Sequence, residues 1–161
     1  MGHYDVAQIC VNGHVVNSYS VKYPEHNSNF CNKCGAKTIN KCTKCGADIQ
    51  GTYHMDNMVN FDEFLAPSYC TNCGKAYPWI EEKLKALDDI IGLMDELSEN
   101  EKEDFKESAR NLTSDNPKTG LSILKIKKFS KKAGQEMWGL AKDLIVQIST
   151  EAALKGMGIK S

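Results

Sequence analysis

Cysteine and histidine residues form four pairs in the N-terminal half of the chain, and their types and spacing are those of metal ligands. Three pairs have the C-x-x-C spacing followed by glycine, and the first pair has the C-x-x-x-H spacing. The eight residues are Cys10, His14, Cys31, Cys34, Cys42, Cys45, Cys70 and Cys73. Because zinc in structural sites takes four sulfur or nitrogen ligands, eight ligands predict two Zn²⁺ ions per chain.

The C-x-x-C-G sequence has a physical basis. A turn of this length brings two thiolates to one ion at bonds of about 2.3 Å, and backbone N–H groups of the turn can point at the sulfurs. Gly35, Gly46 and Gly74 follow the second cysteine of each turn and permit the positive φ with which the chain leaves it. Gly13 precedes the histidine of the first pair, whose longer side chain suits the wider loop.

The four pairs can share two ions in either of two ways. In a sequential arrangement the first two pairs hold one ion and the last two hold the other, with sixteen and twenty-four residues between the pairs of each site. In a cross-braced arrangement, as in RING domains, the first pair joins the third. Seven residues separate the two middle pairs here, more than RING domains have, so we favour the sequential arrangement.

The ligand sets favour structural over catalytic metal. A catalytic zinc keeps one position open for water, whereas eight ligands close both sites. An iron ion for electron transfer would suit the four cysteines of the second site but not the histidine of the first. His26 and His54 are the remaining acid–base candidates. No nucleophile or carboxylate stands at a telling spacing from His54, and His26 stands beside Glu25 in a polar loop, which is no better. We therefore predict no catalytic residues and no enzyme activity.

Charge is unevenly distributed along the 161 residues, although the net charge is only −1. Residues 1–77 carry six acidic and six basic residues, residues 78–118 carry twelve and six, and residues 119–161 carry three and eight. The chain has one arginine, Arg110. Nucleic-acid binding depends on cationic contacts to phosphate, so the neutral N-terminal half is a poor candidate for it.

The sequence also indicates a compartment. No stretch approaches the ~20 apolar residues of a membrane span, and the N-terminus lacks the order of a signal peptide. Seven cysteines, an odd number, suit metal binding in a reducing compartment better than disulfides. We expect a cytoplasmic protein.

Short strands are predicted on both sides of the first pair, over residues 4–11 and 14–23, and a further strand over 49–54. So few large apolar residues accompany them that metal binding, worth on the order of 10 kcal/mol per site, would have to stabilise this half. Residues 55–67 contain several large apolar side chains. We expect these to be buried against helices, with a partner-binding segment as the alternative.

Helical patterns occupy the rest of the chain. A helix is predicted from Pro78 to about Leu97, and the capping box Ser98–Glu101 starts a second one. One long helix or a broken pair follows Leu121, with Gly134 and Gly139 as weak points and apolar positions at Leu124, Met137, Leu140, Leu144, Ile148 and Ala152. The predicted class is α+β: two zinc ribbons in residues 1–77 and an α-helical region in residues 78–161.

A lysine cluster lies at the start of the last helical segment: Lys125, Lys127, Lys128, Lys131 and Lys132. The acidic helices of the same chain are its first expected partner. A nucleic acid or an anionic surface is the alternative. Trp138 is expected in the core, with an interface as the alternative.

Three stretches of the N-terminal half belong together: the run Tyr4 to Val15 with Cys10, Asn12, Gly13 and His14, then Phe30-Cys31-x-x-Cys34-Gly35, and then Cys42-x-x-Cys45-Gly46. In these motifs the chain resembles an uncharacterised bacterial family of double zinc-ribbon proteins. The resemblance implies a bacterial, intracellular zinc protein and nothing about its chemistry.

These observations predict a non-catalytic zinc-binding adaptor that holds a protein partner, with self-association through the helices as one form. The alternatives are a nucleic-acid-binding regulator that uses the lysine cluster, and a RING-like recruiter if the ligands are cross-braced.

Overall fold

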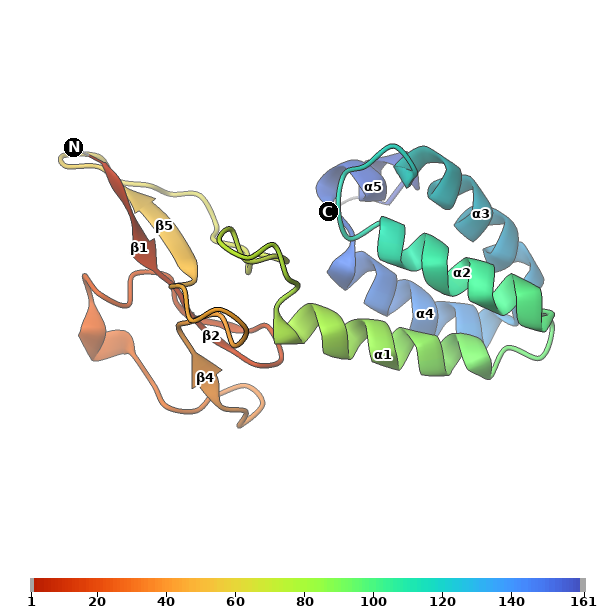
Figure 1. The fold of residues 1–161 in the computed structure, drawn as a ribbon, viewed down its shortest axis with the longest axis horizontal. Coiled ribbons are helices and arrows are strands. Elements are labelled where there is room, and N and C mark those ends of the chain that lie inside the picture. Colours follow the sequence, from red (N-terminus) through yellow and green to blue (C-terminus); the bar gives the residue numbers. More distant parts are fainter. Residues whose placement is uncertain (1, 160–161) are drawn as a thin grey trace. The chain divides into compact units, whose positions relative to one another are not determined.

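The chain forms two compact units, Met1–Glu81 and Glu82–Ser161, in a computed structural model that describes residues 2–159. Figure 1 shows strands in the first unit and helices in the second, so the predicted α+β class is confirmed. Helix α1 (Pro78–Gly92) begins at the end of the first unit and continues into the second.

Two small antiparallel sheets build the N-terminal unit. Strand β1 (His3–Val6) pairs with β5 (Gln50–His54), and β2 (Gln8–Cys10) lies between β3 (Val15–Asn17) and β4 (Thr38–Ile39). A short 3₁₀ helix, Pro24–His26, follows β3. The strands are at most five residues long, so each contributes only one or two side chains to a core.

The core of this unit is small and partly polar. Ala7, Ile9 and Ile49 are fully buried. The buried carboxylate of Asp5 accepts hydrogen bonds from the backbone N–H groups of Val21 and Lys22, at 3.0 and 3.2 Å, and so fixes the turn after β3. With so little apolar surface buried, the strands alone are poorly stabilised against chain entropy.

Residues 55–67 form neither helix nor strand, and the prediction that their apolar side chains are buried is wrong for most of them. Met58, Val59, Phe61 and Leu65 are 64–91% exposed. The interior of the unit is already filled: Trp79 is buried, stacks on Tyr77 with ring centroids 4.7 Å apart, and donates its indole N–H to the carbonyl of Pro67 at 2.9 Å.

The second unit contains α2 (Glu99–Asn111), α3 (Thr119–Lys132), α4 (Gln135–Ile148) and α5 (Glu151–Gly156). Its core includes Phe105, which is fully buried and stacks on Phe129 with centroids 5.3 Å apart. Trp138 is half-buried at the edge of this pair, 6.4 Å from Phe105.

The predicted capping box is confirmed, because Ser98 and Glu101 exchange hydrogen bonds of 3.1 and 3.2 Å at the start of α2. The preceding helix is shorter than predicted. It ends at Gly92, and Met94 and Leu97 are buried in the turn that follows.

The last helical segment is broken twice, at Ala133–Gly134 and at Ser149–Thr150, and Gly139 lies inside α4 without breaking it. Leu124 and Leu140, predicted on the buried face, are 65% and 51% exposed. The backbone is extended at each break, so the helix after it faces the core with a different set of positions. A single 3.6-residue period of apolar residues therefore does not describe the whole segment. Each helix buries its own stripe, such as Ile123, Ile126 and Phe129 in α3 and Ala141, Ile145 and Ile148 in α4.

Candidate metal centres

The structure brings the eight candidate ligands together in two groups of four. Cys10, His14, Cys31 and Cys34 form the first group, and Cys42, Cys45, Cys70 and Cys73 form the second. Within each group, the ligand atoms all lie within 4.8 Å of one another. This is the sequential arrangement, and the cross-braced alternative is wrong. Both groups lie in the N-terminal unit.

Distances between the ligand atoms fit a tetrahedral ion. Four sulfurs bonded at about 2.3 Å to one ion stand about 3.8 Å apart, and a histidine nitrogen at about 2.0 Å stands about 3.5 Å from each sulfur. The sulfur–sulfur distances are 3.7 Å for Cys10–Cys34, 3.8 Å for Cys42–Cys73 and 3.6 Å for Cys45–Cys70. Disulfides, at about 2.05 Å, are excluded by the same distances.

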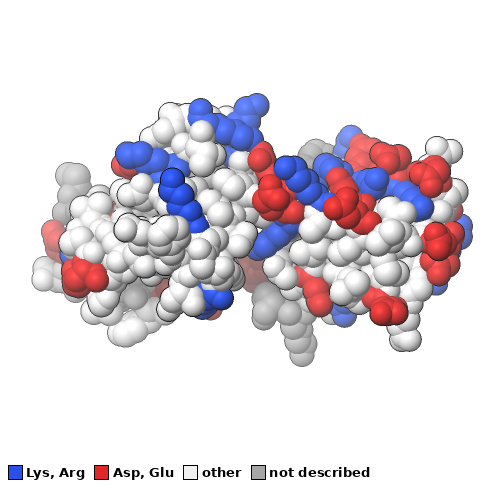
Figure 2. Space-filling model, turned by 90° about the horizontal axis from the view of Figure 1, so that it is seen from below, with Lys and Arg blue, Asp and Glu red and all other residues white. Residues whose placement is uncertain are grey.

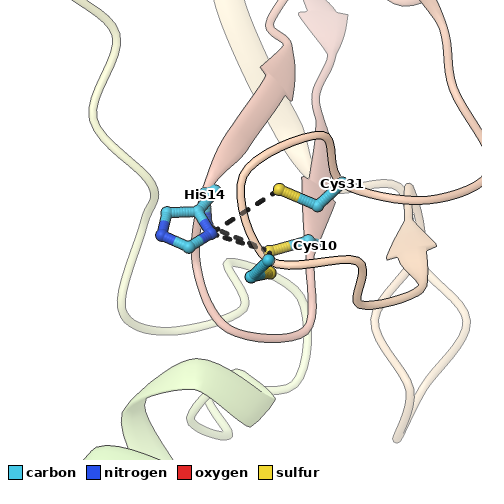
Figure 3. A group of neighbouring side chains, drawn as sticks. Cys10, His14 and Cys31 are labelled. Atoms are coloured by element: carbon cyan, nitrogen blue, oxygen red, sulfur yellow. Dashed lines mark hydrogen bonds between the residues drawn. The ribbon is translucent and has the colours of Figure 1, made fainter.

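The first group takes a nitrogen ligand from His14. Its Nδ1 atom lies 3.4 Å from the sulfur of Cys10 and 3.6 Å from that of Cys31, and Figure 3 shows the imidazole edge facing both thiols. Gly13 has a φ of 94°, a value that glycine adopts readily, and it turns the chain so that the His14 N–H reaches the Cys10 sulfur at 3.3 Å. The wider C-x-x-x-H loop therefore brings its two ligand atoms as close together as a C-x-x-C turn does.

The three C-x-x-C turns share one backbone pattern. In each, the N–H of the first cysteine donates to the carbonyl five residues later, and the N–H of the glycine donates back to the carbonyl of the first cysteine. The glycines Gly35, Gly46 and Gly74 have φ values of 72–77°. The chain therefore uses the same metal-binding turn three times, as the spacing predicts.

An asparagine side chain supports each group through a hydrogen bond to a cysteine sulfur, and neither was predicted from the sequence. The Asn12 amide donates to the sulfur of Cys34 at 3.4 Å, and the Asn72 amide donates to that of Cys45 at 3.5 Å. Both asparagines stand two residues after the first ligand of their own pair. The other pair of ligands in each group has a lysine at the equivalent position, Lys33 in the first group and Lys44 in the second. This difference between the two pairs of a group is the sequence feature that could have identified the asparagines.

These hydrogen bonds favour ionised thiols. A backbone N–H from Ala36 and the amide of Asn12 lower the pKa of Cys34 to about 6. The amide of Asn72 is the main cause of a lowered pKa at Cys45. Thiolate is the form that binds a metal, so both asparagines prepare an exposed cysteine for coordination.

The second group holds thiols of contrasting acidity. Backbone N–H groups of Cys73 and Asn72 lower the pKa of Cys70 to about 6. The backbone N–H of Lys75 lowers the pKa of Cys73, but burial and the neighbouring thiols outweigh it and raise that pKa to about 11. A divalent ion must displace the Cys73 proton on binding, so its affinity for this group falls as the pH falls.

Replacing Asn72 with alanine should make the second group release its ion at a higher pH. Without the amide, the pKa of Cys45 rises and protons compete better with the metal, and loss of such a supporting hydrogen bond weakens metal affinity by about 10- to 100-fold. The pH midpoint of metal release into a chromogenic chelator measures the effect. Asn32→Ala is the matched control, because Asn32 is exposed in a C-x-x-C turn and its side chain bonds to no sulfur among residues 2–159. An unchanged pH midpoint in Asn72→Ala would show that the Asn72 amide does not support metal binding.

His54 and His26, the two acid–base candidates of the sequence, both have charged neighbours. His54 has the ammonium of Lys22 at 3.2 Å from its Nδ1 and the carboxylate of Asp56 at 3.7 Å from its Nε2. His26 lies in the exposed 3₁₀ helix, 4.0 Å from Glu25. These contacts of the two rings are with charged side chains and not with a hydroxyl or thiol that a histidine could activate.

The lysine cluster is partly neutralised, as the charge distribution predicts. Lys125 donates to Asp104 at 2.9 Å and Lys132 to Glu101 at 2.8 Å, both on α2. The other three, Lys127, Lys128 and Lys131, are exposed and make no ion pair within residues 2–159. Figure 2 shows acidic and basic side chains interspersed on the surface of the helical unit.

Comparison with protein families matches residues 3–157 to a family described as "Uncharacterized protein conserved in bacteria (DUF2321)". The chain belongs to this family. The match runs through both units, so the family includes the helices as well as the paired cysteines, and the two ligand groups fit the double zinc-ribbon character of the resemblance. No curated protein and no solved structure matches the chain. Within residues 2–159, no helix is both long and apolar enough to cross a membrane.

Proposed function

We propose that this chain is a non-catalytic zinc protein whose N-terminal unit binds another protein through an exposed apolar segment. Three features support the proposal: the donor sets of the two ligand groups, the absence of a free position in either group, and the exposure of residues 55–65.

Zinc is the ion that suits both groups. Three thiolates with one imidazole, and four thiolates, are both standard sets for structural zinc, whereas an electron-transfer iron suits only the second. Each structural zinc contributes on the order of 10 kcal/mol to folding. That contribution is needed here, because the strands bury so little apolar surface.

The four protein donors of each group occupy the four positions of a tetrahedral ion. No position is left for a water or a substrate, so the ions serve folding and perform no hydrolysis. The RING-like alternative has no support, because it requires cross-braced ligands and the groups are sequential.

The observation that carries the interaction proposal is the exposed apolar segment from Met55 to Leu65. Phe61 is 91% exposed and Val59 is 73% exposed. Beside them is a hollow of about 390 Å³, lined in part by Tyr19 and Tyr53. Contiguous exposed apolar surface marks protein-binding sites, and the flexible side chains of Met55 and Met58 can adapt to a partner.

Site-specific photo-cross-linking in native cells tests this proposal. A photoreactive residue at position 61 should give a discrete cross-linked product, which is either another protein or a second copy of the chain. The same residue at position 93 is the control, because Leu93 is 69% exposed but lies in the helical unit. Met58→Asp in the same chain should abolish the product. If position 61 gives no more product than position 93, the interaction proposal is wrong.

A further inference from the structure

A second hollow lies beside the metal-binding turn Cys31–Gly35, and no residue of segment 55–65 lines it. Its volume is about 320 Å³, and its lining joins side-chain amides, an aromatic ring and a lysine: Gln8, Asn29, Phe30, Lys37, Thr38 and Asn40. Gln8 comes from β2 and Thr38 from β4, so two hydrogen-bonded strands position its floor.

The floor of this hollow is fixed by hydrogen bonds. Gln8 donates to the Thr38 hydroxyl at 3.2 Å and accepts from the backbone N–H of Ser28 at 2.9 Å, and Thr38 donates to the Ser28 carbonyl at 2.6 Å. The rim is different. The side-chain amides of Asn29 and Asn40 are exposed and hydrogen-bond to nothing within residues 2–159. Two amides, each both donor and acceptor, are thus available to a ligand.

Phe30 is the aromatic member, and its exposure of 62% has no packing explanation. It stands directly before the first cysteine of its turn, where the other two C-x-x-C turns have Lys41 and Tyr69, so the same turn forms with a lysine at this position. The position therefore does not require an aromatic ring for folding. The backbones of Phe30 and Lys37 form an antiparallel β-bridge across the turn. The phenyl ring and the ammonium group are therefore carried by adjacent backbone segments.

The surroundings are cationic. Residues 1–77 as a whole are neutral, which argued against nucleic-acid binding, but the charge is unevenly placed: residues 28–47 contain four lysines and no acidic residue. Lys41 pairs with Asp48 and Lys44 with Glu81, whereas Lys33 and Lys37 have no ion-pair partner within the described residues. Figure 2 shows lysines on the N-terminal unit with little acidic surface between them. A zinc ion with three thiolates would carry a charge of about −1, which offsets only part of the two free lysines.

We propose that this hollow binds a nucleotide unit, with the base stacked on Phe30, its edge hydrogen-bonded by Asn29 and Asn40, and the phosphate beside Lys37. Exposed aromatic rings bind unpaired bases by stacking, and amides read their edges. The nucleotide belongs either to a single strand of nucleic acid or to a free nucleotide. Duplex DNA is excluded as the ligand because its bases cannot reach the ring.

Fluorescence anisotropy with the zinc-loaded full chain tests the proposal. The probes are labelled single-stranded RNA and DNA of about 12 nucleotides, and competition by AMP and UMP distinguishes the two sources. Base stacking contributes about 1–3 kcal/mol, so Phe30→Ala should weaken binding about tenfold or more, while Phe30→Tyr retains it. Lys37→Glu should also weaken binding and lower its salt dependence.

Tyr4→Ala is the matched control, because Tyr4 is an aromatic residue of the same unit that is 54% exposed and lies outside this hollow. Zinc content and circular dichroism confirm that each variant is folded. No binding of any probe at low salt would overturn the proposal. It would also be overturned if Phe30→Ala bound normally while the triple change Lys127→Glu, Lys128→Glu and Lys131→Glu abolished binding. Neither result bears on cross-linking at position 61, so the two proposals fail separately.

Discussion

Removal of zinc by a strong chelator should unfold the N-terminal unit and leave the helical unit folded. The two ions together contribute on the order of 20 kcal/mol, far more than the small core of Ala7, Ile9, Ile49, Tyr77 and Trp79 can replace. The helical unit holds no ligand of either group and buries its own apolar core. Backbone NMR spectra should therefore lose the dispersed signals of the strands and keep those of α2 to α5.

The control for chelation is to add zinc back to the chelated protein, which should restore the strand signals. The Cys70→Ser variant lacks one thiolate of the second group. Even with zinc present, residues around that group should lose their dispersed NMR signals, as they do in the chelated protein. Retention of dispersed strand signals without metal would contradict the structural role of the ions.

Truncation of Phe105 should have the second largest effect, in the other unit. Phe105 is fully buried and stacks on Phe129, so Phe105→Ala leaves a cavity in the centre of the helical unit. The expected loss in the free energy of unfolding is about 3–5 kcal/mol. Urea denaturation followed by helical circular dichroism measures it.

Leu93→Ala is the control for Phe105→Ala, because Leu93 is an apolar residue of the same unit that is 69% exposed. Zinc content should remain two per chain in both variants, since the ligands belong to the other unit. A loss below about 1 kcal/mol in Phe105→Ala would show that the helices are not held by this core.

The ligand groups could be predicted from the sequence because their chemistry is local. A C-x-x-C-G turn has the same geometry wherever it occurs, so the spacing identifies the ligands and the number of ions without knowledge of the fold. The hydrogen bonds from Asn12 and Asn72 were missed because each amide reaches a cysteine more than twenty residues away. Such contacts become visible only when the pairs are known to share an ion.

Errors in the helical and apolar predictions have a different cause. Leu124 and Leu140 fit an apolar period that runs through the break at Gly134, but the chain changes direction there and a new period starts. The apolar residues of segment 55–67 give no sign in the sequence of whether a core remains for them to enter. Trp79 and the strands already fill it, which is a property of the folded unit.

The central claim is that two zinc ions are fully enclosed by protein ligands, and X-ray absorption at the zinc edge of the purified chain tests it most directly. The account predicts two ions per chain with sulfur and nitrogen neighbours alone, at about 2.3 and 2.0 Å, and with seven sulfurs and one nitrogen shared between them. An oxygen neighbour from a bound water, or a single ion per chain, would contradict it.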